Sequence, residues 1–457
     1  MADIETLLAD AVGARDVLAG AAIPPEYAGD ESLTALRQLP AYVVRPAATA
    51  EVADVLRIAG EAGIPVTARG SGTGMSGGCV PRPGGITVSF ERMNHILEVD
   101  TVNHVAVVQP GVTLDQLDHE AAESGLHYPV RLGEPTASIG GTIATNAGGM
   151  HAVRYGVTRH HVLAVEAVLA SGEVVRNGGK YVKTSTGYDL TQLLVGSEGT
   201  LALVTEATLR LRARGRHSTT VLAAFASAED VFRSVAPLAG GNLEPIALEY
   251  VDLLAMAAIA EDHKTGLGVP ASVRRTALGY LLVVLESNSA TRLQEDVEAA
   301  GEQLLGLGAL DVFVLSAPTA RKLVEARERA FWTAKAAGAD DVVDVVVPRG
   351  ELSGLLAAAS AVAEDTGSLV TGCGHAGDGN VHLSVFQPDP VRRDEVLRRL
   401  LRAGLERGGT VSGEHGIGRA KKPYFLALED PVRVGLMRRI KHAFDAAGIL
   451  NPGVLFD

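Results

Sequence analysis

The chain has 457 residues, of which 47% are hydrophobic and 21% charged, and its formal net charge is −13 at pH 7. This composition is typical of a folded globular protein, and the acidic balance argues against broad electrostatic binding to nucleic acid. The length favours two or three domains, and two cysteines, Cys79 and Cys373, predict no disulfide framework.

The amino terminus lacks the basic and apolar regions of a secretory signal. No apolar run reaches the roughly 20 residues that a transmembrane helix needs. We therefore expect a cytoplasmic protein without a transmembrane segment, and leave open peripheral docking at the inner face of the membrane.

The first half of the chain begins with residues 1–35, which predict one or two short helices and a loop. A helix is predicted over 49–62, capped by Thr49 and ended by Gly63. Further strands are expected in the first half, and these cover 64–68, 86–89, 105–108, 162–169 and 173–175.

A glycine-rich loop, RGSGTGMSGG, occupies residues 69–78. A nicotinamide-type dinucleotide site needs a helix directly after such a loop, whereas prolines and strands follow here. The backbone N–H groups of the loop could instead hold phosphate. A second stretch, 133–156, is dense in Gly, Ala, Ser and Thr, so a large flat ligand could approach the backbone closely.

The second half of the chain alternates strand-like and helix-like runs, an α+β pattern consistent with a sheet covered by helices. A composition change near 213–218 suggests a domain boundary. Helices are predicted over 318–340, 350–366 and 391–407, with a strand over 381–386.

The strongest chemical signal is GCGHAGDGNVH at 372–382, which offers His375 and His382 within eleven residues separated by glycines that let the backbone fold tightly. A second glycine loop places Glu414 next to His415. Imidazoles with a carboxylate suit zinc, iron, copper or manganese. Because neighbours on an extended backbone point to opposite sides, we expect Glu414 to bind a metal and His415 to face a substrate. Arg327 could clamp a carboxylate, although a solvated helix face is the simpler interpretation of its surroundings.

Taken in order, six motifs resemble those of FAD-linked 2-hydroxy-acid dehydrogenases of the vanillyl-alcohol-oxidase type. That group includes glycolate oxidase flavoprotein subunits, D-lactate dehydrogenases and D-2-hydroxyglutarate dehydrogenases. The resemblance covers nearly the whole chain, through RGSGTGMSGG (69–78), GEPTASIGGTIATNAGG (133–149), GSEGTLALVTEATL (196–209), GHAGDGNVH (374–382), SGEHGIG (412–418) and NPG (451–453).

The resemblance implies an α+β fold with an FAD-binding domain of two α+β subdomains and a cap domain with an antiparallel sheet covered by helices. On this chain the N-terminal helical segment would be residues 1–35 and the FAD-binding domain 36–215. The cap domain with the metal site would span 216–440, and residues 441–457 would return to the flavin domain.

Individual roles follow from the same resemblance. His375, His382 and Glu414 match the metal ligands, His415 the substrate-facing base, and Arg327 an arginine that contacts the substrate acid. Some relatives attach FAD through a histidine where this chain has Thr73, so non-covalent FAD is expected. The implied cofactor-binding residues are Arg69, Gly70, Ser71, Gly72, Thr73, Gly74, Pro135, Thr136, Ser138, Gly141, Thr142, Thr145, Asn146, Gly149, Glu198, Gly199, Val204 and Asn451.

The chain also departs from the hydroxyglutarate enzymes of this group. Val342 stands where they have lysine, Phe331 where they have threonine, and Ser384 where they have asparagine. Fewer polar groups favour a small anionic D-2-hydroxy acid with one carboxylate, lactate or glycolate. D-2-hydroxyglutarate, or a role as the flavoprotein subunit of a respiratory complex acting on another alcohol, stays open.

The expected metal is a divalent ion, with zinc favoured. The electron acceptor is not identified by the sequence, and a quinone, a cytochrome, a flavoprotein or an iron–sulfur subunit would each serve. A homodimer is a further alternative, and no nucleic-acid partner is expected.

Overall fold

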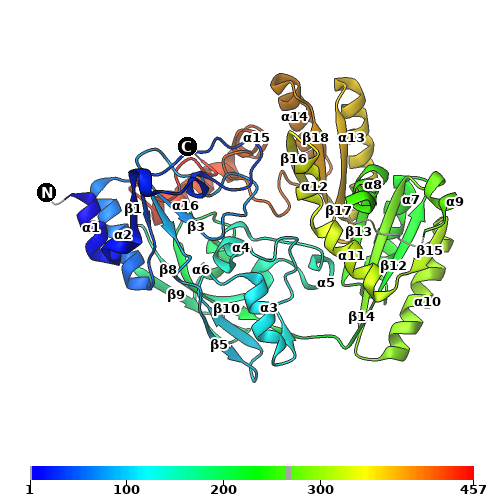
Figure 1. Cartoon of the computed structure of the whole chain (residues 1–457), viewed down its shortest axis with the longest axis horizontal. Helices are drawn as coiled ribbons and strands as arrows, with labels where there is room; N and C mark the ends of the chain where they lie inside the picture. The colour runs from blue at the N-terminus through cyan, green and yellow to red at the C-terminus, as the bar shows by residue number, and fades with distance from the viewer. Residues whose placement is uncertain (1–2, 263–268, 457) are drawn as a thin grey trace.

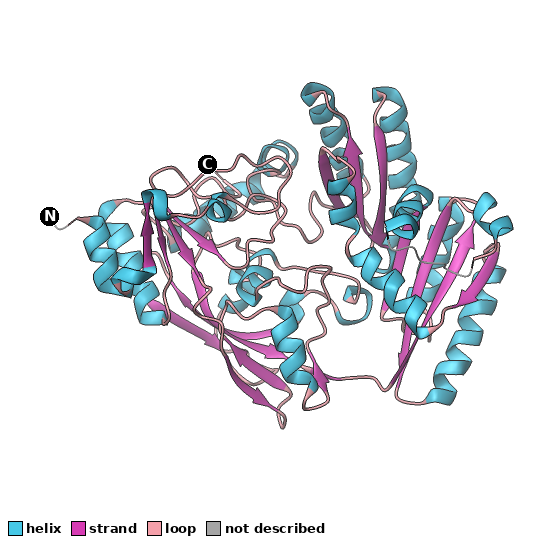
Figure 2. Cartoon of the chain, viewed as in Figure 1, coloured by secondary structure: helices cyan, strands magenta, loops and turns pink. Residues whose placement is uncertain are grey.

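The computed structural model describes residues 3–262 and 269–456. Figure 1 shows two lobes, one formed by the amino-terminal part of the chain together with the C-terminus, the other by the middle of the chain. Both helices and strands contribute to each lobe, as Figure 2 shows. The predicted α+β class is confirmed, and the domain boundaries at 35/36, 215/216 and 440/441 stay predictions.

A four-stranded sheet forms the first layer of the amino-terminal lobe. Its order is β1-β2-β4-β3, with β3 and β2 parallel to β4. Its strands are β1 (Val17–Ala19), β2 (Tyr42–Val44), β3 (Val66–Arg69) and β4 (Ile86–Ser89), and the helices beside it are α1 (Ile4–Val12) and α2 (Thr49–Ala62). Leu8 of α1 and Leu56 of α2 share a buried core with Ile86.

The second helix corrects one prediction. Ala48, not Thr49, is the N-cap residue of α2, and it makes no side-chain cap. The hydroxyl of Thr49 donates instead to Glu166 Oε1 at 2.5 Å, so this side chain serves the buried carboxylate and does not accept from the backbone N–H groups at the helix start. Gly63 ends the helix in the left-handed conformation at φ 64°, as expected.

A five-stranded antiparallel sheet forms the rest of this lobe, in the order β5-β6-β10-β8-β9. Its strands are β5 (Ile96–Asp100), β6 (Val105–Val108), β8 (Val162–Val168), β9 (Val174–Gly178) and β10 (Leu203–Arg210). The helices of this part are α3 (Leu114–Ala122), α4 (Ile139–Thr145), α5 (Ala152–Tyr155) and α6 (Leu190–Leu194). A two-stranded ribbon, β7 (Leu126–His127) with β11 (Arg212–Ala213), precedes the crossing to the second lobe.

A seven-stranded antiparallel sheet forms the second lobe, in the order β15-β12-β14-β13-β17-β18-β16. Its strands are β12 (His217–Phe225), β13 (Ala247–Asp252), β14 (Gly279–Ser287), β15 (Asp311–Val314), β16 (Asp341–Val346), β17 (Leu369–His375) and β18 (Asn380–Phe386). Its helices are α7 (Ala228–Gly240), α8 (Leu253–Asp262), α9 (Ala271–Thr276), α10 (Ala290–Gly306), α11 (Ala317–Glu328), α12 (Ala330–Ala336), α13 (Leu352–Thr366) and α14 (Pro390–Glu406).

Alternation along these strands separates the two faces of the sheet. Val343 and Val345 of β16 and Leu383 of β18 join a core that also contains residues of α7, α10, α13 and α14. The intervening residues of the same strands therefore point to the other face. Part of that face packs on α8 and α11, and the part formed by β16, β17 and β18 is the wall of a cavity.

The C-terminal segment lies against the amino-terminal lobe. Leu450 forms a parallel bridge with Val66 of β3, and Lys441 of α16 (Pro431–Phe444) donates to the carbonyls of Thr200 and Leu450, at 2.8 Å each. Helix α15 (Lys422–Leu428) precedes α16. The chain thus closes on the strand that leads into the glycine-rich loop.

Candidate active site

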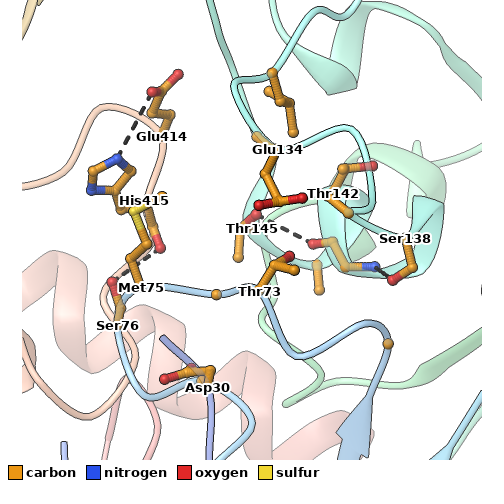
Figure 3. Close-up of a pocket in the computed structure, with 18 of the residues that line it drawn as sticks. Asp30, Thr73, Met75, Ser76, Glu134, Ser138, Thr142, Thr145, Glu414 and His415 are labelled. Carbon is orange, nitrogen blue, oxygen red and sulfur yellow. Dashed lines mark hydrogen bonds and ion pairs between the residues drawn. The ribbon is translucent and has the colours of Figure 1, made fainter. Parts of the chain in front are cut away.

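One cavity extends from the glycine-rich loop to the histidines of the second lobe. Figure 3 shows Thr73 and Met75 on one side of it, Ser138 and Thr145 of the small-residue stretch on another, and His415 at one end. Fourteen of the eighteen predicted cofactor-binding residues line this cavity, namely Gly70, Ser71, Gly72, Thr73, Gly74, Ser138, Gly141, Thr142, Thr145, Gly149, Glu198, Gly199, Val204 and Asn451.

The other four predicted cofactor-binding residues do not line it. Arg69 is buried beneath the loop, where Nη1 donates to the Gly29 carbonyl at 2.6 Å. The Pro135 carbonyl accepts from Asp115, and Thr136 donates to Glu134. Asn146 ends α4 in the left-handed conformation and accepts from the Arg159 backbone. These residues hold the loops, and the sequence could not separate that role from cofactor contact.

Sequence reasoning missed several lining residues. Ser76 and Cys79 continue the glycine-rich loop along the wall, and Asp30 reaches it from the amino-terminal segment. Glu134 also lines the cavity, and its carboxylate accepts a hydrogen bond from the Thr136 hydroxyl. Ser76 and Cys79 could have been found by extending the loop motif, but nothing local in the sequence connects Asp30 with this cavity.

The glycine-rich loop fits a polyanionic group. The backbone N–H groups of residues 70–75 donate no hydrogen bond within the described chain, so they are available to a ligand. Gly72 has a φ of 76°, a conformation that favours glycine, and a Cβ there would lie 2.1 Å from Arg69 Nη2. Such a nest of free N–H groups is suited to the pyrophosphate of FAD.

Glu198 holds the loop that carries Glu414 and His415 against the amino-terminal lobe. Its carboxylate accepts the backbone N–H groups of Ile417 and Gly418 at 2.9 and 2.8 Å. Burial raises the pKa of Glu198 to about 7. The Asn451 amide donates to the carbonyls of Glu198 and Gly78, both at 2.8 Å. Three segments that are distant in sequence are thereby fixed around one cavity.

The predicted metal ligands converge. Nε2 of His375 lies 3.3 Å and Nε2 of His382 3.1 Å from Glu414 Oε1. The three ligand atoms lie within 4.8 Å of one another. The glycines of the hairpin allow this approach, since a Cβ at Gly374 would lie 2.4 Å from the Asn380 carbonyl. Two imidazoles and one carboxylate form a donor set suited to a divalent transition metal.

Glu249 supports this cluster from β13. Nδ1 of His375 donates to both its oxygens, at 2.8 and 2.9 Å, which leaves Nε2 of His375 free to face Glu414. A carboxylate on the far nitrogen of a histidine is the usual support of a metal ligand. Burial opposes charge on His375, but Glu249 and Glu414 outweigh it and hold the His375 pKa well above its usual range. Glu249 was not predicted, although an acid within the apolar run IALEYV was a signal.

Arg327 also lies in the cavity wall, at the C-terminal end of α11. It is 3% exposed, and its Nη2 lies 2.8 Å from Glu249 Oε2. Its Nε has no hydrogen-bond partner in residues 3–262 and 269–456. The solvated helix face that the sequence favoured for Arg327 is therefore wrong, and a buried guanidinium with a free donor faces the same space as the histidines.

The arrangement of Glu414 and His415 corrects the expectation of opposite directions. Both side chains line the cavity, and His415 Nε2 lies 3.9 Å from Glu414 Oε1. The backbone here is a compact turn, because Asp344 Oδ2 accepts the N–H groups of residues 413, 414 and 415 at 2.8 to 3.0 Å. The same carboxylate lies 3.9 Å from His415 Nδ1. Burial lowers the pKa of His415 to about 4, so its imidazole is neutral near pH 7.

Comparisons with known proteins agree with this geometry, which is that of a flavoprotein. A family model described as "FAD linked oxidases, C-terminal domain" matches residues 214–455, and one described as "FAD binding domain" matches 40–178. The chain belongs to the FAD-linked oxidase family and is an FAD-dependent oxidoreductase. FAD is its cofactor, as predicted.

Among similar proteins is an uncharacterized FAD-linked oxidoreductase of Mycobacterium tuberculosis, 52% identical over 100% of this chain and 99% of that protein. A D-lactate dehydrogenase of Anaerostipes hadrus is 36% identical over 97% of this chain and 95% of its own length. A glycolate oxidase subunit of Bacillus subtilis is 36% identical over 92% and 90%.

Solved structures share the fold. A p-cresol methylhydroxylase with substrate bound superposes with a TM-score of 0.81 at 18% identity, over 99% of this chain and 96% of that one. A 4-ethylphenol oxidase of Gulosibacter chungangensis gives 0.79 at 20% identity, with the same coverage.

Within the described ranges, no helix combines the length and apolarity that crossing a membrane requires.

Proposed function

We propose that this flavoprotein oxidises a small D-2-hydroxy acid with one carboxylate, lactate or glycolate, to the 2-oxo acid, with the help of a divalent metal. One observation carries the proposal. A donor set of His375, His382 and Glu414, a neutral His415 and a buried Arg327 all line the same cavity as the glycine-rich loop 69–78.

The cofactors define the chemistry that the residues serve. FAD, expected to bind non-covalently, would supply hydride acceptance, and a divalent ion, zinc favoured, would supply Lewis-acid polarisation of the substrate hydroxyl. His375, His382 and Glu414 would hold the ion, with Glu249 fixing the orientation of His375. The fourteen predicted cofactor-binding residues that line the cavity would hold FAD, and Asn451 near the C-terminus is one of them.

The chain's own groups supply the proton transfer and the positioning. His415 Nε2 takes the hydroxyl proton, while Asp344, near Nδ1, favours the charge that the ring then acquires. The free Nε donor of Arg327 binds the substrate carboxylate. Because Arg327 is 3% exposed and the His415 side chain only 10% exposed, their electrostatic effect on the substrate is stronger than it would be in water.

The names of the relatives support a hydroxy-acid substrate. Besides the lactate and glycolate proteins, a D-2-hydroxyglutarate dehydrogenase of Xanthomonas citri is 33% identical over 92% of this chain. Val342 and Phe331 in the cavity wall favour the monocarboxylates. The name "glycolate oxidase subunit" keeps a respiratory-complex subunit as the second hypothesis, with a quinone, cytochrome, flavoprotein or iron–sulfur acceptor.

The central experiment mixes the yellow holoenzyme anaerobically with D- and L-2-hydroxy acids, before and after removal of metal by a chelator, and follows flavin bleaching. We expect the D-acids to bleach the flavin and the chelator to slow bleaching. His415→Asn should retain FAD and slow flavin reduction by at least ~100-fold, the scale of general-base loss. His442→Asn, on an exposed histidine, is the control. No bleaching with any acid would overturn the proposal.

A further inference from the structure

The cavity wall beside the His–Glu cluster is largely apolar. Phe331 and Trp332 contribute to it from α12, Val342 from β16 and Cys373 from β17. Ser384 of β18 completes this wall. Below, these five residues are called the side-chain wall.

Strand register places the side-chain wall next to the cluster. On β18, Ser384 follows His382 by two residues, so both point to the cavity face about 6.7 Å apart. Val342 pairs with Ser384 across to β16, and Cys373 pairs with His382 across to β17. A substrate held at His382 would therefore extend its side chain along β18, toward Val342 and Ser384.

The charges around this wall favour one carboxylate in the substrate. Arg327 is the single lysine or arginine among the described residues that line the cavity, and Glu249 already lies 2.8 Å from it. The other charged neighbours at this end include Glu328 and Glu414. A second carboxylate at the side-chain wall would lose its water without gaining a cation, which is strongly unfavourable.

The aromatic part of the wall is held in place. The rings of Phe331 and Trp332 lie 5.4 Å apart in an edge-to-face arrangement. Lys335 Nζ lies over both rings, at 5.8 and 5.2 Å, and pairs with Glu31 at 2.6 Å. Its ammonium group is thus already paired with Glu31, and the two rings contribute apolar surface to the cavity.

We propose that the side-chain wall is a specificity subsite for 2-hydroxy monocarboxylic acids whose side chain is apolar and has at least three carbons, branched or aromatic. The inference rests on the proposed oxidation of a 2-hydroxy monocarboxylate, and within that class it moves the preferred acid from lactate or glycolate to a larger apolar one. Burial of each additional methylene should raise kcat/KM about fourfold. 2-Hydroxy-4-methylpentanoate has three more carbons than lactate, so an increase of at least tenfold is expected.

The test measures kcat/KM of the holoenzyme for D-glycerate, glycolate, D-lactate, D-2-hydroxy-4-methylpentanoate, D-3-phenyllactate and D-2-hydroxyglutarate. The expected order places the branched and phenyl acids first, lactate and glycolate lower, and the polar and dicarboxylic acids last. A preference for glycolate, lactate or the dicarboxylate over both apolar acids would overturn the subsite. No flavin reduction by any acid would instead overturn the proposed function.

Two variants test the residues themselves. Val342→Lys should lower kcat/KM for 2-hydroxy-4-methylpentanoate at least tenfold and raise that for 2-hydroxyglutarate, because the ammonium group can pair with the second carboxylate. Val314→Lys, on a residue 61% exposed on β15, is the matched control and should change neither value. Phe331→Ala should lower kcat/KM for phenyllactate by a factor at least tenfold greater than the factor by which it lowers kcat/KM for lactate.

A binding measurement on the wild type tests the subsite even if a variant does not fold or an acid is not turned over. Trp332 is the only tryptophan of the chain, so its fluorescence reports on the side-chain wall. Titration with 4-methyl-2-oxopentanoate should change this fluorescence in the wild type at lower concentration than pyruvate does. Equal midpoints for the two oxo acids would contradict the subsite even if all acids are turned over.

Discussion

Replacing Glu249 with glutamine removes one charge and almost no volume from the support of the histidine cluster. In the wild type, this fully buried carboxylate accepts from His375 Nδ1 at 2.8 Å and lies 2.8 Å from Arg327 Nη2. The glutamine amide has only one acceptor oxygen, so one of these two partners must face an NH2 group. Glu249→Gln should therefore weaken both metal binding and the fold.

General magnitudes for such sites set the expected size of both effects. Loss of a carboxylate behind a metal-binding histidine costs about 10- to 100-fold in metal affinity. The fold loses one partner of a buried ion pair and leaves Arg327 uncompensated, which costs on the order of 3–5 kcal/mol. Glu229→Gln is the control, because that side chain is 69% exposed and pairs with Arg233 on the same helix.

The assay equilibrates metal-free holoenzyme with zinc and a competing chelator, and follows unfolding by denaturant separately. The expected result is a 10- to 100-fold higher zinc dissociation constant in Glu249→Gln, with FAD still bound, and a wild-type value in Glu229→Gln. A folded Glu249→Gln protein with unchanged zinc affinity would refute the reasoning that Glu249 supports a metal ligand.

Three further predictions concern the frame of the cavity. Burial raises the pKa of Glu198 to about 7, so the folded state holds this proton more tightly than the unfolded chain; the stability it contributes is present below pH ~4.5 and is lost as pH rises through ~7. Denaturant unfolding at several pH values should show that the free energy of unfolding of Glu198→Gln does not fall over this pH range, whereas that of the wild type falls by at most about 3 kcal/mol. Identical pH profiles of the two proteins would contradict this prediction. Gly72→Ala should lower the affinity for FAD at least tenfold in flavin fluorescence titrations, because its Cβ would clash with Arg69. Gly84→Ala is the control: Gly84 also has a positive φ, but a Cβ there would lie in open space, so FAD should stay bound. Lys441→Met leaves two carbonyls without their donor and the buried Asp445 without its ion-pair partner, and should destabilise the fold by at least about 2 kcal/mol. Limited proteolysis should then release the C-terminal segment, and an unchanged cleavage pattern would count against its docking role.

Sequence patterns predicted the elements well where period and length were strong. Strands 86–89 and 105–108 and the helix 49–62 have the predicted bounds. The short strand β1 was not predicted, because its three residues VLA are all apolar and show no alternation of polar and apolar side chains. The predicted helix 318–340 is two helices broken near Arg329, followed by the start of β16.

The sequence predicted the motif residues of the candidate site, but it did not predict the carboxylates that hydrogen-bond to them. Glycine spacing and histidine pairs pointed to His375, His382, Glu414 and His415, which the structure brings together. The supporting carboxylates come from strands whose contact with these loops is decided by sheet order, which no local pattern contains. Glu249 is one of them.

The hairpin between β17 and β18 has a consequence for insertions and deletions. Gly379 turns the chain at φ 90°, and a Cβ there would lie 2.0 Å from the Val347 carbonyl, so the length of this turn is fixed by close packing. Adding or removing one residue would shift β18 by one position and exchange its two faces. Leu383 would then enter the cavity and His382 the apolar core. Over evolutionary time, related chains should vary the identity of residues in the side-chain wall far more freely than the number of residues between His375 and His382.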